Sequence, residues 1–139
     1  MANSVVECTS AQAWQALSTD ARAALVDVRT QPEWNFAGIA DLGSLNKDVV
    51  AISWKLYPTF EINQTFVDQL KSMIPDVTTP LYFICKTGGR SHDAAQAALN
   101  AGYQVCYNIL DGFEGDHNSA HQRGHINGWK ATQLPWEQA

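Results

Sequence analysis

The chain has 139 residues, 45% of them hydrophobic and 17% charged, which suits one domain with a buried core and argues against disorder. Its net charge of −5 argues against nucleic acid as the main partner, because phosphate binding needs a surplus of Lys and Arg. No apolar segment approaches the ~20 residues that cross a bilayer, and the N-terminal residues do not resemble a signal peptide.

The cysteines indicate the compartment. Cys8, Cys85 and Cys106 are too few and too far apart for a disulfide scaffold. Free thiols suit a reducing environment. We therefore expect a cytoplasmic protein with no membrane partner.

The first part of the chain alternates strand and helix patterns. Residues 4–8 and 23–28 are short apolar and β-branched segments, which predicts two strands. Ser10 is placed to cap a helix over residues 11–20. After the second strand, Pro32 suits the first turn of a short helix.

The middle of the chain continues this alternation. Residues 48–54 are predicted to form a strand, and apolar residues spaced by three or four predict a helix over 62–74. Pro75 ends that helix. Residues 81–85 are continuously apolar, as is typical of a central parallel strand that is covered on both faces.

The last part adds a helix, a strand and a loop. The helix after Cys85 is predicted to end at Gly102, which suits a left-handed C-terminal cap. A strand is expected over 104–110, glycine-rich loops over 111–128 and a last helix over 125–133. Strands that alternate with helices predict a single α/β domain over residues 1–139, with a parallel sheet and helices on both faces.

The segment Cys-Lys-Thr-Gly-Gly-Arg-Ser (85–91) joins the apolar strand to its helix. Ligands of open α/β sheets bind beyond the carboxyl ends of the strands, where this segment lies. Its glycines permit positive φ angles, and the helix start supplies unpaired N–H donors. We therefore predict that an anion-binding loop surrounds the sulfur of Cys85. The residues of that loop are Lys86, Thr87, Gly88, Gly89, Arg90 and Ser91.

Cys85 itself has two interpretations. Free cysteine is among the most buried residue types, so it can be a core residue that ends a strand. The backbone N–H groups, the helix start and the cations of Lys86 and Arg90 all favour the thiolate, which is the nucleophilic form. We interpret Cys85 as a catalytic nucleophile.

The loop length bears on the group that is bound. Enzymes of the tyrosine-phosphatase type place Arg six positions after the nucleophilic Cys, so that its guanidinium grips phosphate oxygens in a bidentate manner. Here that position is Ser91, and the arginine is one position earlier, at Arg90. The tighter ring of N–H groups suits a smaller group, such as a single persulfide sulfur.

Several segments together resemble a single-domain rhodanese, a thiosulfate sulfurtransferase-like protein. They are LVDVRTQPEW (25–34), CKTGGRS (85–91), AGY (101–103), NILDGFEG (108–115) and NGWKATQLPW (127–136). The resemblance extends from residue 5 to residue 136. It implies a rhodanese-like α/β fold, with a five-stranded parallel sheet and helices on both faces. It also implies that Cys85 carries a persulfide.

The activity implied by this resemblance is sulfur transfer. The thiolate of Cys85 would take a sulfane sulfur from thiosulfate or a similar small anionic donor. It would then pass the sulfur to cyanide or to a thiol, including a thiol on a partner protein. Lys86 and Arg90 would attract the donor. This covalent cycle needs neither a metal nor an organic cofactor.

Other ionisable residues form weaker patterns. Asp27 and Arg29 flank a strand end, with Glu33 within reach of Arg29, and structural ion pairing is the expected role. Asp111 and Glu114 follow another strand, where they either shape the rim of the pocket or lie on a solvated loop.

His117, His121 and His125 recur every four residues, but glycines interrupt any helix there and no further ligand is evident. We therefore predict no metal site. Cys106 lies within a predicted strand and is expected in the core, where it is badly placed to resolve a bond to Cys85.

Two alternatives to a sulfurtransferase stay open. One is a phosphatase or arsenate reductase on the same fold, which the short loop disfavours. The other is a non-catalytic persulfide carrier or regulatory module, whose Cys85 accepts sulfur from a partner.

Overall fold

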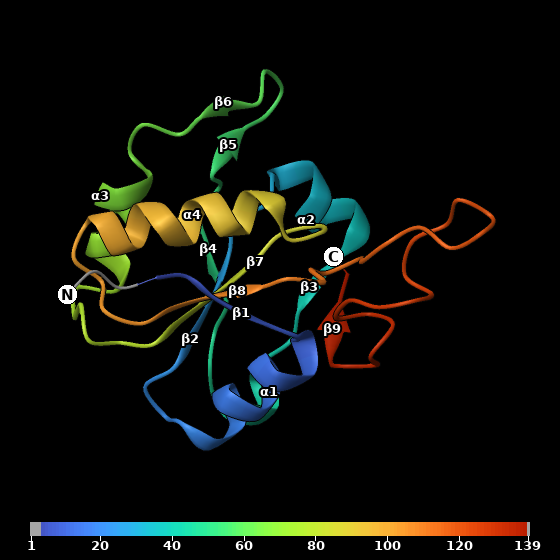
Figure 1. Cartoon of the computed structure of the whole chain (residues 1–139), viewed down its shortest axis with the longest axis horizontal. Helices are drawn as coiled ribbons and strands as arrows, with labels where there is room; N and C mark the ends of the chain where they lie inside the picture. Colours follow the sequence, from blue (N-terminus) through green and yellow to red (C-terminus); the bar gives the residue numbers. More distant parts are fainter. Residues whose placement is uncertain (1–3, 139) are drawn as a thin grey trace.

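The structure, a computed structural model, describes residues 4–138, and its centre is a five-stranded parallel sheet (Figure 1). The strands are β1 (Val6–Cys8), β2 (Ala24–Asp27), β4 (Val50–Ala51), β7 (Leu81–Ile84) and β8 (Cys106–Ile109). They lie in the order β1-β8-β7-β2-β4, so β7 occupies the middle, and every pairing is parallel. The predicted fold class is confirmed.

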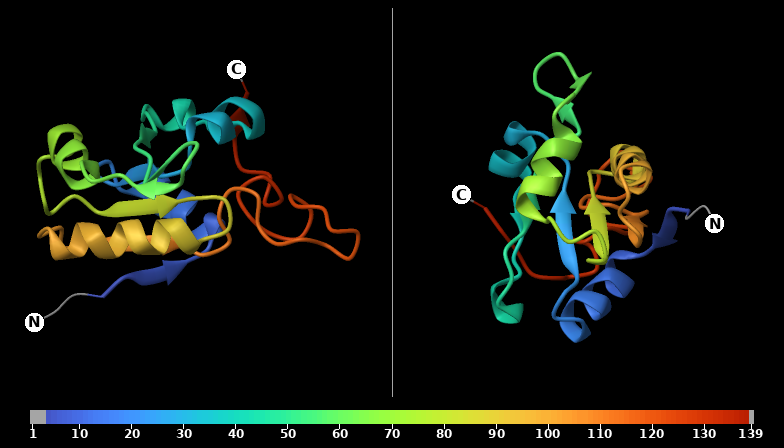
Figure 2. Two further views of the ribbon diagram at one scale, coloured as in Figure 1. Left: turned by 90° about the horizontal axis from the view of Figure 1, so that it is seen from above. Right: turned by 90° about the vertical axis from the view of Figure 1, so that its left-hand side faces the viewer.

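Helices cover both faces of this sheet (Figure 2). They are α1 (Ser10–Thr19), α2 (Gln31–Ala37), α3 (Phe66–Met73) and α4 (Gly89–Asn100). On one face, α3 and α4 contribute Phe66, Leu70 and Ala94 to a buried core. On the other face, α1 contributes Ala13 and Leu17 to a second core.

Strand β7 belongs to both cores, because successive side chains of a strand point to opposite faces. Phe83 packs in the core under α3 and α4, whereas Tyr82 and Ile84 pack in the core under α1. All four side chains of β7 are buried. This two-sided burial is the reason that the segment is continuously apolar.

Several short elements lie outside the central sheet. They are β3 (Ile39–Ala40), which pairs antiparallel with β9 (Trp136–Glu137), a single 3₁₀ turn η1 (Gly43–Leu45), and β5 (Lys55–Leu56), which pairs antiparallel with β6 (Glu61–Ile62). The β5–β6 hairpin projects from the body of the domain (Figure 1). Between residues 4 and 138, no helix has the length and apolar character needed to cross a bilayer.

Helix α1 is capped one residue earlier than predicted. The Oγ1 of Thr9 accepts the N–H of Gln12 (3.2 Å), and the side chain of Gln12 accepts the N–H of Thr9 (2.9 Å). This reciprocal capping box satisfies two otherwise unpaired donors. Ser10 is the first helical residue, and its side chain is buried.

The strand predicted over residues 48–54 is shorter in the structure. It forms β4 over Val50–Ala51 only, at the edge of the sheet, where it has a single neighbour, β2. Beyond it, Ile52 donates its N–H to the carbonyl of Asp27 (3.0 Å). The chain therefore follows β2 further than the regular strand does.

The helix predicted over residues 62–74 begins only at Phe66. Ile62 is part of the β5–β6 hairpin instead. The Oδ1 of Asn63 then accepts the backbone N–H (3.1 Å) and the hydroxyl (2.9 Å) of Thr65. Such local bonds compete with helical ones and delay the start of the helix.

The helix predicted over residues 125–133 does not form, and turns replace it. Gly128 has φ +99°, which is incompatible with a helix. Trp129 is fully buried, and its backbone N–H donates to the carbonyl of Gly112 (2.9 Å). Tertiary packing therefore overrides the local helical pattern.

Candidate active site

Cys85 is the first residue after β7, and α4 begins four positions later, at Gly89. The structure thus confirms that the cysteine lies between the central strand and a helix start, although α4 begins two residues before the predicted position near Ser91. Cys85 is nearly enclosed, with 1% of its surface exposed. Its side chain belongs to the core under α3 and α4.

Two groups lie within hydrogen-bond distance of the Cys85 sulfur. The backbone N–H of Gly88 donates to Sγ (3.1 Å), and the Oγ of Ser91 lies 3.2 Å from Sγ. Gly88 adopts φ +102°, which turns its N–H inward. Gly89 was expected to share this freedom, but it is already helical. One glycine therefore makes the turn.

Ser91 is held by a polar network that the sequence analysis missed. Its Oγ lies 2.5 Å from the Oδ1 of Asn108, a buried residue of β8. The Nδ2 of Asn108 donates to the carbonyl of Gly88 (3.0 Å) and to the Oε2 of Glu7 (2.8 Å). Because the carbonyl of Gly88 and the carboxylate of Glu7 are both acceptors, the NH₂ group of Asn108 faces them and its Oδ1 faces Ser91. A polar residue inside a predicted buried strand was the available signal.

A bracing segment, residues 112–115, supports the loop from behind. The carbonyl of Cys85 accepts the N–H of Phe113 (2.8 Å), and the carbonyl of Lys86 accepts the N–H of Glu114 (3.1 Å). A Cβ on Gly112 would collide with the backbone of Lys86. The loop and the bracing segment are therefore in direct backbone contact, and this contact fixes the path of the loop.

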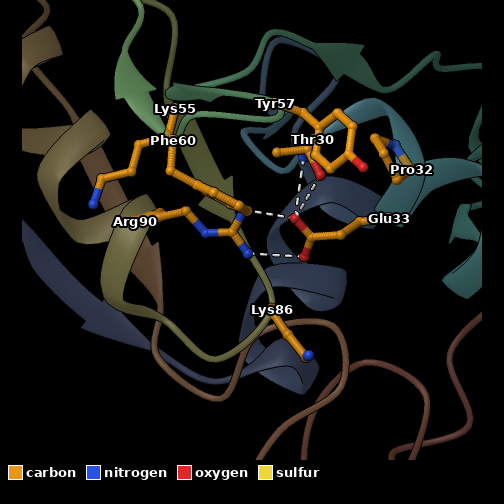
Figure 3. A pocket seen from close by; sticks show the side chains of 8 residues that line it. All are labelled: Thr30, Pro32, Glu33, Lys55, Tyr57, Phe60, Lys86 and Arg90. Atoms are coloured by element: carbon orange, nitrogen blue, oxygen red, sulfur yellow. Dashed lines mark hydrogen bonds and ion pairs between the residues drawn. The ribbon is translucent and has the colours of Figure 1, made fainter.

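The cations of the loop lie next to a cavity of about 560 Å³ (Figure 3). Its lining residues are Thr30, Pro32, Glu33, Lys55, Tyr57, Phe60, Lys86 and Arg90. Arg90 and Glu33 form a bidentate ion pair, with Nη1–Oε1 and Nη2–Oε2 distances of 2.6 and 2.8 Å. The expectation that Glu33 reaches Arg29 is wrong. Arg29 pairs with Asp27 instead (2.8 Å).

The ion pair shifts the titration of both partners. The hydrogen bonds that Arg90 donates to Glu33 raise the pKa of Arg90 against the opposing effect of burial, and the negative charge of Glu33 adds to the increase. Burial acts to raise the pKa of Glu33. The hydrogen bonds and charge of Arg90, together with hydrogen bonds from Thr30, outweigh it and place that pKa below its ordinary value. Both groups are therefore charged at neutral pH.

The Glu33→Gln variant tests whether Glu33 is charged and paired with Arg90. Because the pKa of Glu33 is lowered by folding, its contribution to stability is present above the ordinary value of 4.5 and is lost as the pH falls through the lowered value. We expect the variant to have a lower free energy of unfolding than the wild type at neutral pH. This difference should shrink as the pH falls through the lowered pKa of Glu33. Urea unfolding at several pH values measures it. A difference that does not change with pH would contradict the assignment.

Three other candidate residues, Asp111, Glu114 and Thr87, do not line the cavity. Asp111 is neither at the rim nor on a solvated loop: it is buried, and its Oδ1 accepts the N–H and the hydroxyl of Ser10 (both 2.9 Å). Its Oδ2 accepts the N–H of Gly128 (3.0 Å). Asp111 thus ties α1 to the C-terminal loops. Glu114 is half-buried and does not line the cavity, and Thr87 is exposed.

The histidines and the second cysteine also lie apart from Cys85. His117, His121 and His125 are exposed, and residues 4–138 contain no group of three metal-binding side chains. Cys106 is buried in the core, as expected, and burial raises the pKa of its thiol to about 12. It is therefore unreactive at neutral pH.

Sequence comparison gives a family for this chain. A family model described as the STR4 middle domain matches residues 6–139. The uncharacterized protein RC0915 of Rickettsia conorii is 39% identical over 135 residues, which cover 96% of this chain and 98% of that protein. The rhodanese-like domain-containing protein 4, chloroplastic, of Arabidopsis thaliana is 28% identical over 125 residues. That match covers 89% of this chain but 24% of the plant protein.

Solved structures have a similar fold. The crystal structure of Rv0390 from M. tuberculosis has a TM-score of 0.91 and 42% identity, and the match covers 99% of this chain and 100% of that chain. The polysulfide-sulfur transferase of Wolinella succinogenes has a TM-score of 0.67 and 20% identity, with 97% and 80% covered. The neighbours share the rhodanese-like arrangement. This chain belongs to the family of the STR4 middle domain and has a rhodanese-like fold.

Proposed function

We propose that the protein is a sulfurtransferase that carries a sulfane sulfur as a persulfide on Cys85. The observation that supports this most is the position of the Cys85 sulfur at the end of β7. There it accepts the N–H of Gly88 and lies beside the hydroxyl of Ser91, at the N-terminal end of α4. The N–H of Gly88 is fixed in advance beside the sulfur, and such a donor stabilises a negative charge there.

The proposed cycle has two balanced steps. In the first, the electron pair of the Cys85 thiolate forms a bond to the outer sulfur of thiosulfate, the S–S bond of the donor breaks, and its electrons leave with sulfite. In the second, cyanide or a thiolate attacks the outer sulfur of the Cys85 persulfide. Thiocyanate or a new persulfide then leaves, and the Cys85 thiolate returns.

The same geometry disfavours phosphate chemistry. A phosphatase of this kind needs an arginine that is free to bind the phosphate oxygens. Arg90 uses both terminal nitrogens on Glu33. Together with the short loop, this pairing favours sulfur over phosphate as the transferred group.

Intact-protein mass spectrometry after exposure to thiosulfate, or to inorganic polysulfide, tests the proposal. We expect the wild type to gain one sulfur atom on Cys85 and to form thiocyanate when cyanide is added. The Cys85→Ser variant is expected to do neither. Cys106→Ser is the matched control, because its buried thiol has a pKa of about 12, and it should behave as the wild type does.

Three outcomes separate the hypotheses. Sulfur gain with thiocyanate formation supports the enzyme. Sulfur gain without turnover indicates the non-catalytic carrier and overturns the enzyme proposal. No gain in the wild type from any sulfane donor, or an equal gain in Cys85→Ser, removes the assignment of Cys85.

A further inference from the structure

The Ser91 hydroxyl has two polar neighbours and a single proton to offer them. Its Oγ lies 2.5 Å from the Oδ1 of Asn108 and 3.2 Å from the Sγ of Cys85. These three residues are each at most 2% exposed, so their contacts are shielded from bulk water. The direction in which the hydroxyl donates therefore decides what it offers to the sulfur.

The carboxamide of Asn108 fixes that direction. Its Nδ2 lies 3.0 Å from the carbonyl oxygen of Gly88 and 2.8 Å from the Oε2 of Glu7, and both of these oxygens are acceptors. A flipped amide would bring Oδ1 against the two oxygens, so the orientation with Nδ2 toward them is favoured. The Oδ1 can only accept a hydrogen bond, and the Ser91 proton is therefore used on Asn108.

The sulfur of Cys85 consequently faces the lone pairs of Ser91. A thiol suits these surroundings, because its S–H donates to Oγ while Sγ accepts the N–H of Gly88 (3.1 Å). A thiolate has no proton to donate, and it gains a bond from Ser91 only if the hydroxyl rotates away from Asn108. Such a rotation leaves the buried Oδ1 of Asn108 without a donor, which is unfavourable.

We propose that Asn108 is a positioning residue that makes Ser91 a hydrogen-bond acceptor toward Cys85, so that the resting site holds the sulfur as a thiol. The functional part of this inference rests on the proposed sulfur transfer through Cys85. The thiol proton has to pass to solvent before the thiolate attacks a donor, and the Ser91–Asn108 contact raises the pH at which it leaves. Because a thiol is a poor nucleophile, the same contact limits unwanted reactions of Cys85 between turnovers.

Charged side chains on the surrounding elements also act on the sulfur. They are Lys86 in the loop, Arg90 and His92 on α4, Glu33 on α2, Asp27 and Arg29 around the end of β2, Lys55 on β5, Glu7 on β1, and Asp111 and Glu114 after β8. Both arginines of this set are paired with carboxylates of the same set. The variants below leave all of these residues in place, so a shift in the titration of Cys85 reports on the hydroxyl and the amide.

A pH titration of the thiolate by its ultraviolet absorbance tests this inference. Each protein is compared with the same protein carrying Cys85→Ser, and Cys8 and Cys106 do not interfere because burial raises the pKa of each thiol to about 12. In Ser91→Ala the thiol loses its acceptor, so the midpoint should move to lower pH by about 0.5–1 pH unit. In Asn108→Ala the freed hydroxyl can donate to the thiolate, so the midpoint should move the same way by at least as much.

Two further proteins check that the effect passes through Ser91. Because Asn108 acts on the sulfur through the hydroxyl, adding Asn108→Ala to Ser91→Ala should leave the midpoint where Ser91→Ala alone places it. Ser10→Ala is the matched control. Ser10 is also a buried serine in the first turn of a helix, and its Oγ lies 2.9 Å from the Oδ1 of Asp111. Its removal should not move the titration of Cys85.

The sign of the shift decides the outcome. A midpoint in Ser91→Ala that is unchanged, or that lies at higher pH, would overturn the inference, because the hydroxyl would then be neutral toward the sulfur or a donor to it. A further shift in the double variant would overturn the role of Asn108. If Asn108→Ala does not fold, Ser91→Ala alone still decides. None of these results depends on catalysis, so the absence of sulfur gain from any sulfane donor would remove the proposed function without deciding the direction of this hydrogen bond.

Discussion

Replacing Gly88 by alanine is expected to remove most of the sulfur uptake at Cys85. Gly88 has φ +102°, which an alanine adopts only with strain, and an added Cβ would collide with the carbonyl oxygen of Leu110. Since that oxygen belongs to the backbone, the loop has to move, and the Gly88 N–H leaves the sulfur. We expect uptake to slow by about 10²-fold and the free energy of unfolding to fall by about 1–3 kcal/mol.

The neighbouring glycine supplies the control. Gly89 is helical, and no atom lies within 4 Å of the position that its Cβ would take. Gly89→Ala should therefore take up sulfur at the wild-type rate, and the helix gains up to ~1 kcal/mol of stability. Quenched time courses of sulfur gain at Cys85 compare the uptake rates of the two variants, and urea unfolding compares their stabilities. Normal uptake in Gly88→Ala, or an equal loss in both, would show that the N–H of Gly88 does not act on the sulfur.

Replacing Asp27 by alanine is expected to have the largest effect on stability. Asp27 and Arg29 are both fully buried, and the guanidinium donates to both carboxylate oxygens and to the carbonyl of Gly38 (2.7 Å). It also lies 4.2 Å from the ring centre of Phe113. Removal of the carboxylate leaves a buried, unpaired cation, so the free energy of unfolding should fall by about 3–5 kcal/mol.

Two further variants check the cause of that loss. Asp76→Ala breaks the ion pair with Arg22, whose partners are both more than half exposed, and should scarcely move the urea midpoint. Asp27→Leu/Arg29→Met removes both buried charges and should recover much of the lost stability. If the double variant is as unstable as Asp27→Ala, the loss comes from packing rather than from the stranded charge.

The sheet and the cysteine loop could be predicted from the sequence because their signals are local. Residues 81–85 are continuously apolar, and burial on both faces of β7 explains the pattern. The loop from Cys85 to Ser91 keeps its glycines, cations and helix start within one short segment. No distant contact is needed to recognise such a segment as the turn between a strand and a helix.

The partners of these residues could not be predicted, because they depend on contacts between distant parts of the chain. Arg90 pairs with Glu33, 57 positions earlier in the sequence, and Ser10 binds Asp111 across 101 positions. Neither pairing leaves a periodic pattern. Strands of two residues, such as β9, are also too short to give one.

The contacts of the bracing segment have a consequence for protein engineering. The chain path around the sulfur depends on amides that follow β8, since Phe113 and Glu114 bind the carbonyls of Cys85 and Lys86. Grafting Cys-Lys-Thr-Gly-Gly-Arg onto the strand-to-helix turn of an unrelated scaffold would transfer the residues of the loop without the bracing segment that supports them. A portable version of this site needs two separate pieces of chain, brought together by the host.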